Sequence, residues 1–372
     1  MKFLSAILFV FTLFLTNGES EFRESFSTET YNDILDKAPE YYLLEWKAGT
    51  KLSKRKAGLF IKIDSFDDQE VAVMVNGNQD PVLYASDVST PVCADGECKL
   101  MHIRLYWTLL GEYAGFDTYP KLPLTKHDHD EFRKEDYEKL HKLLADDKSI
   151  LKRRRIDELV EEPVMRNVNG VDALSGATVA EVKESVVSGA LYSCYVAWHL
   201  THGTIRDEIK THTLSTLNAN MLTDMLYSQN TDYQLFALEK MDSSQFIEHH
   251  SQTVRIFKTA VPLVRSIIAK EMPEKFRNRP ELQRPFWEAF PEIDIGSRSL
   301  LLRHLESAPP YVGDIVSAQL GSMTKNQIAV FLEFLSPKKH TPELLKNLHS
   351  FADSENEAYS YLVKNYLEEH VP

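Results

Sequence analysis

The stretch EVAVMVNGNQDPVLYASDV, residues 70–88, holds two short apolar runs on either side of Asn76-Gly77. An Asn-Gly pair between two such runs is a strong local signal for a β-hairpin. Similar runs lie outside this hairpin, LFIKI at 59–63 and LMHIRLYWTLLGEY at 100–113. We therefore predict an antiparallel sheet that extends from about Leu59 to Phe116.

Helical patterns follow the predicted sheet. Residues 117–160 are rich in charge and place Leu140, Leu143 and Leu144 on one side of a helix. The segment VAEVKESVVSGALYSCYVAWHLTHG, residues 179–203, repeats apolar residues at near-helical spacing, and it predicts a single buried helix that stops at Gly203. The fold class expected up to this point is α+β.

From about residue 211 to its end the chain is helical in pattern. Short polar breaks separate successive apolar faces, and no stretch matches a specific repeat consensus. We predict HEAT-like stacked helix pairs here, with an irregular helical bundle as the open alternative. The predicted helices cover residues 214–228, 231–241, 253–271, 297–306, 310–321, 324–335, 341–352 and 356–369.

Composition restricts the class of partner. The 372-residue chain has a formal net charge of -13, which argues against general binding to a nucleic-acid backbone. The one basic block, residues 152–155, is interpreted as a solvated helix face, with a lipid or nucleic-acid role as the alternative. We expect no nucleic-acid partner.

The first 18 residues have the pattern of an export signal. Met1-Lys2 precedes the apolar run FLSAILFVFTLFL, and small residues follow it. The run is shorter than the roughly 20 residues that a membrane-spanning helix needs. We predict a signal peptide over 1–18 and a periplasmic or other extracytoplasmic location. An uncleaved signal that keeps the protein at the membrane is the open alternative.

Cysteines and histidines supply two minor candidate sites. Cys93 and Cys98 flank a short loop, and in an oxidising compartment we expect a disulfide, with a redox-active pair or metal ligands as alternatives. Cys194 is expected to be a buried small hydrophobe. His127 and His129 form a His-x-His pair, a weak metal candidate that needs a third ligand; a polar loop or helix start is the alternative.

The string DALSGAT, residues 172–178, has two interpretations. Thr178 and Glu181 fit the capping-box pattern Thr-x-x-Glu, in which Thr178 accepts hydrogen bonds from free amides of a helix's first turn. Gly176 permits a backbone conformation that other residues adopt at a cost. Taken alone, this spacing needs no ligand.

The same string closely resembles the flavinylation motif of the FMN-binding domain family, found in flavin subunits of the Rnf and sodium-translocating NADH:quinone oxidoreductase complexes. The resemblance implies that Thr178 carries FMN covalently as a phosphoester. Asp172, Ser175, Gly176 and Ala177 are then the surrounding recognition residues. It also implies that a separate flavin transferase, which uses FAD and a divalent metal, installs the FMN.

The resemblance covers roughly residues 58–203. GEYAGFD at 111–117 is similar to a glycine- and tyrosine-containing segment of these domains. The implied organisation is a signal at 1–18, a lead-in at 19–57, an FMN-binding-like domain at 58–203 and helical repeats at 204–372. The implied function is extracytoplasmic electron transfer with an unidentified redox protein, either membrane-bound or not, rather than turnover of a small molecule by the chain itself.

Two other classes of function remain open. In one, the chain is a non-enzymatic exported scaffold and the SGAT segment only caps a helix. In the other, it is a thiol-redox or metal protein centred on the cysteine pair or the histidine pair. Four aromatic residues are either packing partners of a flavin ring or members of the sheet core: Tyr106, Trp107, Tyr113 and Phe116.

Overall fold

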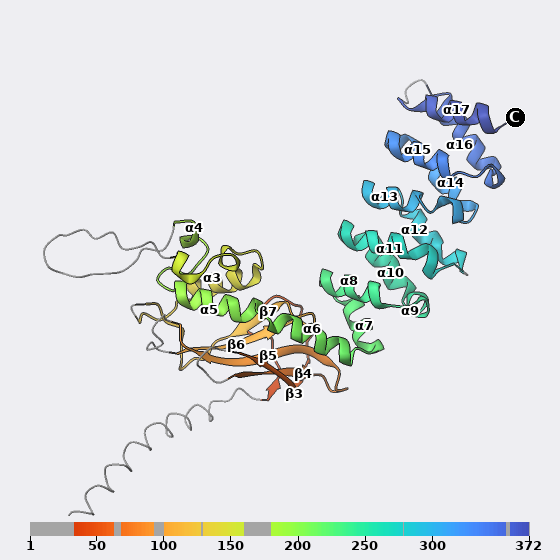
Figure 1. The fold of residues 1–372 in the computed structure, drawn as a ribbon. Helices are drawn as coiled ribbons and strands as arrows, with labels where there is room; N and C mark the ends of the chain where they lie inside the picture. The colour runs from red at the N-terminus through yellow and green to blue at the C-terminus, as the bar shows by residue number, and fades with distance from the viewer. Residues whose placement is uncertain are drawn as a thin grey trace, which may run out of the picture. The chain divides into compact units, whose positions relative to one another are not determined.

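The computed structural model describes residues 33–62, 68–92, 100–127, 129–159, 180–277, 279–354 and 358–371. The chain divides into two compact units, Met1–Leu217 and Asn218–Pro372. The first unit contains an antiparallel sheet with helices, and the second contains helices (Figure 1). The predicted order, an α+β region followed by a helical region, is confirmed.

The described part of the first unit contains one curled antiparallel sheet with the strand order β1-β3-β4-β5-β6-β7-β2. Consecutive strands from β3 to β7 pair with one another, so the body of the sheet is a meander. The strands are β1 (Ile34–Leu35), β2 (Tyr41–Tyr42), β3 (Leu52–Ile61), β4 (Gln69–Val75), β5 (Pro81–Thr90), β6 (Met101–Trp107) and β7 (Tyr113–Asp117).

The hairpin expected at Asn76-Gly77 joins β4 to β5, which confirms that prediction. Its turn is longer than two residues: the Asn76 N–H donates to the carbonyl of Asp80. The Asn76 side chain accepts from the amides of Asn78 and Asp80, and Gln79 takes the left-handed conformation with φ of 66°. Asn76 thus organises the turn through its side chain, as Asn commonly does.

The sheet begins earlier in the chain than predicted. Strands β1 and β2 and the first half of β3 lie within residues 19–57, which we expected to be a lead-in. The first half of β3 reads LSKRKA, and its exposed or half-buried polar side chains hide the strand from a search for apolar alternation. The lead-in therefore contributes both edges of the sheet.

Helices α3 (Lys134–Ala145), α5 (Leu191–His202) and α6 (Ile205–Thr216) cover one face of the sheet. Trp107 of β6 is fully buried on this face, and its indole N–H donates to the carbonyl of Thr201 in α5 at 2.9 Å. Tyr84 of β5 is also buried there, and its hydroxyl bonds to Thr213 of α6. These contacts fasten the helical layer to the sheet.

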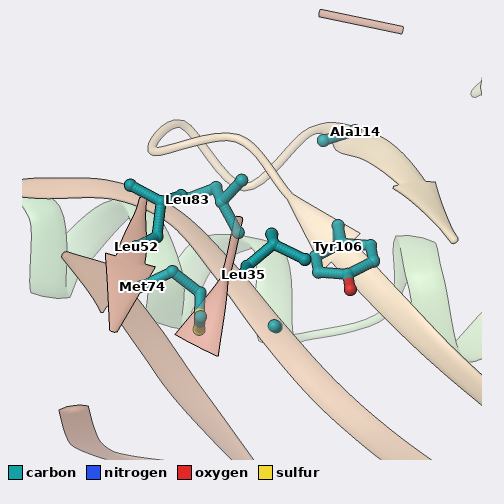
Figure 2. Packing of buried hydrophobic residues seen from close by; sticks show 7 residues of the cluster. Leu35, Leu52, Met74, Leu83, Tyr106 and Ala114 are labelled. Atoms are coloured by element: carbon teal, nitrogen blue, oxygen red, sulfur yellow. The ribbon is translucent and has the colours of Figure 1, made fainter. Parts of the chain in front are cut away.

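The opposite face of the sheet carries a second cluster of buried apolar side chains. Figure 2 shows members of this cluster gathered from strands β1 and β3 to β7. Burying one large apolar side chain, such as that of a leucine or a methionine, stabilises a fold by about 1.5–3 kcal/mol. Partly buried side chains from the segment after β2 pack against it. The cluster consists of Leu35, Leu52, Met74, Leu83, Ala85, Tyr106 and Ala114, with Tyr42, Leu44, Trp46 and Val82 packed around them.

We expected the helical domain to begin at residue 204, and helix α6 follows directly. This helix packs against β3, and the boundary between the two compact units falls after it, at Leu217. Residues 204–217 are therefore described with the sheet.

The second unit is built from helices of about two to four turns. They are α7 (Ala219–Tyr227), α8 (Thr231–Lys240), α9 (Ser243–Glu248), α10 (His250–Thr259), α11 (Pro262–Lys275), α12 (Arg284–Glu288), α13 (Ile295–Leu302), α14 (Tyr311–Ser317), α15 (Lys325–Phe334), α16 (Pro342–Ala352) and α17 (Ser360–His370). Short 3₁₀ turns lie at Pro280–Gln283, Leu305–Ser307, Leu320–Ser322 and Pro337–Lys339.

All of these helices except α7 and α9 lie in two rows. One row runs α8, α11, α13, α15, α17, and the other runs α10, α12, α14, α16, with each helix contacting the next in its row (Figure 1). Within the pairs α7/α8, α10/α11 and α16/α17, the two helices also contact each other. The rows therefore join helices that are separated by one or two other helices in the sequence.

Several helix predictions need correction. A single helix over 253–271 was expected, and α10 and α11 replace it. Pro262 occupies the first position of α11, where its missing N–H is tolerated, whereas inside a continuous helix it would remove a hydrogen bond. The helix predicted over 214–228 is likewise divided, because α6 ends at Thr216 and Asn218 caps α7.

Candidate functional site

The DALSGAT string lies outside the described residues. Asp172, Ser175, Gly176, Ala177 and Thr178 all fall between Leu159 and Ala180, where the described chain resumes. The side chain of Glu181 is also outside it, so the capping-box prediction stays a prediction. The structure does describe the segment that follows the string, beginning at Ala180.

The segment after the string differs from the single helix that we predicted over 179–203. Helix α4 covers only Ala180–Lys183, and α5 begins at Leu191. Between them Gly189 adopts φ of 74°, which ends any continuous helix, and its carbonyl accepts the His127 N–H at 2.7 Å. The predicted burial is nevertheless confirmed, since Val182, Val186, Ala190, Cys194 and Trp198 are all buried.

Helix α4 is too short for its N-terminal end to attract a phosphate strongly through the helix dipole. A helix of four residues is about one turn, so few peptide dipoles add up at its start. The ammonium of Lys139 in α3 donates to the carbonyl of Lys183, the last residue of α4, at 3.2 Å. Lys139 therefore anchors the end of α4 to α3 and adds positive charge beside it.

The surroundings of α5 are held by buried polar contacts. The Trp198 indole N–H donates to the carbonyl of Asp146, and His202 Nε2 lies 2.8 Å from the carbonyl of Leu144. His199 Nε2 contacts the carbonyl of Leu151 at 3.1 Å. These contacts join α5 to the end of α3 and to the 3₁₀ turn at Ile150–Lys152. Helix α5 is thus a fixed part of the fold.

The aromatic residues considered for flavin packing lie in the sheet core. Tyr106, Trp107 and Phe116 have no exposed surface, and Tyr113 is 5% exposed. The Tyr106 hydroxyl donates to Asp117 at 2.6 Å, and Trp107 donates to Thr201. The core interpretation of these four residues is therefore correct, and their rings offer no surface on which a flavin could stack.

One group of rings gathers around His141 of α3. Its Nδ1 lies 2.7 Å from the Tyr113 hydroxyl, and its ring lies 5.8 Å from that of Tyr41 and 6.1 Å from that of Phe116. Burial lowers the pKa of His141 and raises that of Tyr113 well above its usual value. A neutral imidazole that accepts from a protonated phenol satisfies both shifts.

Packing explains the two glycines of GEYAGFD. A Cβ on Gly115 would lie 2.2 Å from the carbonyl oxygen of Tyr41 in β2, and one on Gly111 would lie 2.3 Å from that of Arg206. Gly111 also has φ of 80°. Each glycine therefore allows a close approach of backbone, and neither needs a cofactor to account for it.

The described histidines do not converge on a metal. His127 and His129 are exposed, and His141 is engaged with Tyr113. Among the described residues no group of three or more His, Cys, Asp or Glu side chains is placed to hold a metal ion. His127 and His129 therefore lack a described third ligand.

The cysteine pair cannot be placed, because Cys93 and Cys98 lie outside the described residues. Cys194 is described, is fully buried and is a free thiol, as predicted. Burial raises the pKa of its thiol to about 12, so it stays protonated and unreactive in the folded state.

A buried ionic cluster was missed by the sequence prediction. Arg104 of β6 is 2% exposed, and its Nε lies 3.2 Å from Asp87 Oδ1 of β5. Tyr119 donates to the same oxygen, while Asp117 accepts from Tyr106 and from the Glu40 N–H. Burial raises the pKa of Asp117. The signal in the sequence was a single charged residue inside the apolar run MHIRLYW.

Comparison with known proteins adds no relative. No protein-family model matches the chain, and neither the curated proteins nor the solved structures searched include a match. In the part of the chain that the structure describes, no helix is both long enough and apolar enough to cross a membrane.

Proposed function

We propose that this chain is an exported electron-transfer flavoprotein that carries FMN as a phosphoester on Thr178. The observation that carries the proposal is the string Asp172-Ala-Leu-Ser-Gly-Ala-Thr178, which resembles the flavinylation motif over its whole length. Supporting it are the antiparallel sheet before the string, the helical segment after it and the signal-like first 18 residues.

The proposed attachment uses the Thr178 hydroxyl as a nucleophile. Its oxygen attacks the FMN-side phosphorus of FAD in the active site of the transferase, AMP leaves, and the hydroxyl proton is released. Ser175, Gly176 and Ala177 are small, which lets the transferase approach the backbone, and Asp172 orients or deprotonates Thr178. When bound, the flavin supplies one- and two-electron transfer, and the protein positions it and tunes its surroundings.

The described residues bear on this fit in two opposite ways. Lys139 places a positive charge at the carbonyl of Lys183, five residues after Thr178 in the sequence, and a positive charge favours a phosphodiester within reach of it. The buried aromatic rings of the sheet core leave the isoalloxazine ring without the packing partners that we considered from the sequence. The proposed flavin is therefore tethered through its phosphate, and its ring contacts other surfaces.

The proposed role of the second unit is to dock a protein partner. Its two rows of helices, each packed on its neighbours, support an assignment to HEAT-like repeats, which typically present extended binding surfaces. The partner in this proposal is the redox protein that exchanges electrons with the flavin.

A second function has specific support. In it the chain is an exported helical scaffold, and SGAT only begins a helix. The close backbone contacts at Gly111 and Gly115 and the core positions of the aromatic residues explain these features without a cofactor. They remove the support that the GEYAGFD glycines and the four aromatic rings lent to the flavin proposal.

Intact mass spectrometry separates the two functions. The full chain is co-expressed with a flavin transferase, and the proposal expects an added mass of FMN less one water, together with visible flavin absorbance. Thr178→Ala removes the adduct, whereas Thr178→Ser keeps a hydroxyl and retains some of it. Absence of an adduct on the wild-type chain, while the same transferase labels a known substrate, would leave the scaffold function.

A further inference from the structure

Among the described residues, the outer edge of β3 has a strand partner over only a short part of its length. Strand β4 pairs with the inner side of β3 from Ser53 to Ile61, whereas β1 pairs with the outer side only at Leu52 and Ser53. Within the described ranges no other strand pairs with that outer side. The ten-residue strand β3 is thus flanked on this side by β1, a strand of two residues.

One hydrogen bond shows which way the N–H and C=O groups of β3 point. The Lys54 N–H donates to the Asp33 carbonyl at 2.7 Å, so it points toward the β1 side. Because strand residues alternate in direction with a period of two, the N–H and C=O of Lys56 point the same way. Lys56 is exposed. Lys56 therefore offers one donor and one acceptor on this side, just before the irregularity between Lys56 and Leu59.

Three side chains flank this edge on one face of the sheet. Lys54 pairs with Met74, Lys56 with Ala72 and Phe60 with Glu70, and these β4 partners are spaced by two residues. The irregularity between Lys56 and Leu59 keeps Phe60 on the face of the two lysines. Phe60 is 45% exposed. Two cations followed by an aromatic ring therefore line the edge.

The charge of this strand is opposite to that of the chain. Residues 51–62, KLSKRKAGLFIK, hold five basic residues and no acidic one, while the whole chain carries a net charge of -13. Lysines on an edge strand can serve only to prevent edge-to-edge association. A half-exposed Phe60 on the same face does not fit that role, because it adds apolar surface where a protective edge avoids it.

We propose that the outer edge of β3 docks an acidic, extended segment of a partner protein, which adds a strand to the sheet. Main-chain hydrogen bonds to an open edge supply affinity in this mode of recognition, and alternate side chains supply specificity. Here Lys56 selects an acidic residue directly opposite, the neighbouring Lys54 adds positive charge beside it, and Phe60 selects an apolar residue farther along. The inference rests on the described sheet and is independent of the flavin on Thr178.

The test uses the full chain and a synthetic probe. The probe is a fluorescent, end-capped peptide of alternating Glu and Val that ends in Leu, and binding is followed by fluorescence anisotropy. The expected result is saturable binding that weakens as salt is raised, because surface charges are screened. A control peptide of the same charge replaces alternate Val residues with Pro, which cannot donate a ladder hydrogen bond, and it should bind at least about tenfold more weakly.

Protein variants locate the site. Lys54→Glu with Lys56→Glu should weaken binding of the probe about tenfold or more, since attraction becomes repulsion at two positions. The matched control, Lys142→Glu with Lys148→Glu, changes the charge equally at exposed positions in and after α3 and should leave affinity unchanged. Phe60→Ser should weaken binding by a smaller factor. Thermal unfolding of each variant verifies that it folds.

Hydrogen exchange identifies the occupant. Saturating probe should slow exchange in fragments that cover residues 52–61. Equal binding of the proline peptide would overturn the proposal in favour of charge attraction alone, and self-association of the Lys54/Lys56 variant would indicate a purely protective edge. Strong protection of this edge without probe would also overturn it. If that protection is independent of protein concentration, the chain's own residues before Asp33 cover the edge; if it rises with concentration, a second copy does.

Discussion

The hydroxyl oxygen of Tyr113 in β7 lies 2.7 Å from Nδ1 of His141 in α3, and this contact joins the sheet to its helical layer. Burial lowers the pKa of His141, so the folded state binds a proton there less readily than the unfolded chain does. A group of this kind stabilises the fold above its unfolded pKa of about 6.5, and that contribution is lost as the pH falls through the folded value.

We therefore expect the free energy of unfolding to decrease as the pH is lowered from about 7 to about 5. His199, His202, His212, His304 and His340 also have lowered pKa values and add to the decrease. His141→Gln removes one titrating group and should make the decrease smaller. Urea unfolding of both proteins at each pH measures the difference, and parallel pH profiles would contradict the assignment.

Gly115→Ala should destabilise the first unit. The new methyl group would meet the Tyr41 carbonyl at 2.2 Å and push β2 away from β7. Overpacking of this kind typically costs about 1–3 kcal/mol. Gly77→Ala is the matched control, because nothing lies within 4 Å of its added Cβ. Chemical denaturation followed by circular dichroism compares the two variants. Equal free energies of unfolding would show that β2 can move away from β7 without a loss of stability.

Thr324→Ala should weaken the second unit at the start of α15. The Thr324 side chain accepts from the Gln327 N–H, and the Gln327 side chain accepts from the Thr324 N–H, which completes a capping box. Loss of such a cap typically costs about 1 kcal/mol. Thr324→Ser keeps the hydroxyl and should retain most of the stability. A thermal melt that ranks the alanine variant level with the serine variant would contradict the cap.

The number of reactive thiols tests the proposed Cys93–Cys98 disulfide. The chain has three cysteines, and Cys194 is a buried free thiol with a pKa raised to about 12. With the disulfide formed, the native protein should react with a thiol reagent slowly or not at all, and the unfolded, unreduced protein should show one thiol. Three thiols on unfolding without reductant would rule the disulfide out.

The central strands and most helices were predictable because their signals are local. The runs around Asn76-Gly77 are short and apolar, and the helices near 231–241, 324–335 and 341–352 carry apolar faces with capping residues at their starts. The break at Gly189 was missed because the apolar spacing continues through it. Only its positive φ and the bond from His127 show that the helix stops.

The sequence by itself determined the hairpin, the helical second unit and the seven-residue string on which the flavin proposal rests. Each of these depends on residues that are neighbours along the chain. Tertiary structure decided that the polar stretch LSKRKA is a strand, that Gly115 must lack a side chain and that Tyr113 meets His141. These outcomes depend on residues far apart in sequence, and only the folded chain brings their backbone and side-chain atoms together.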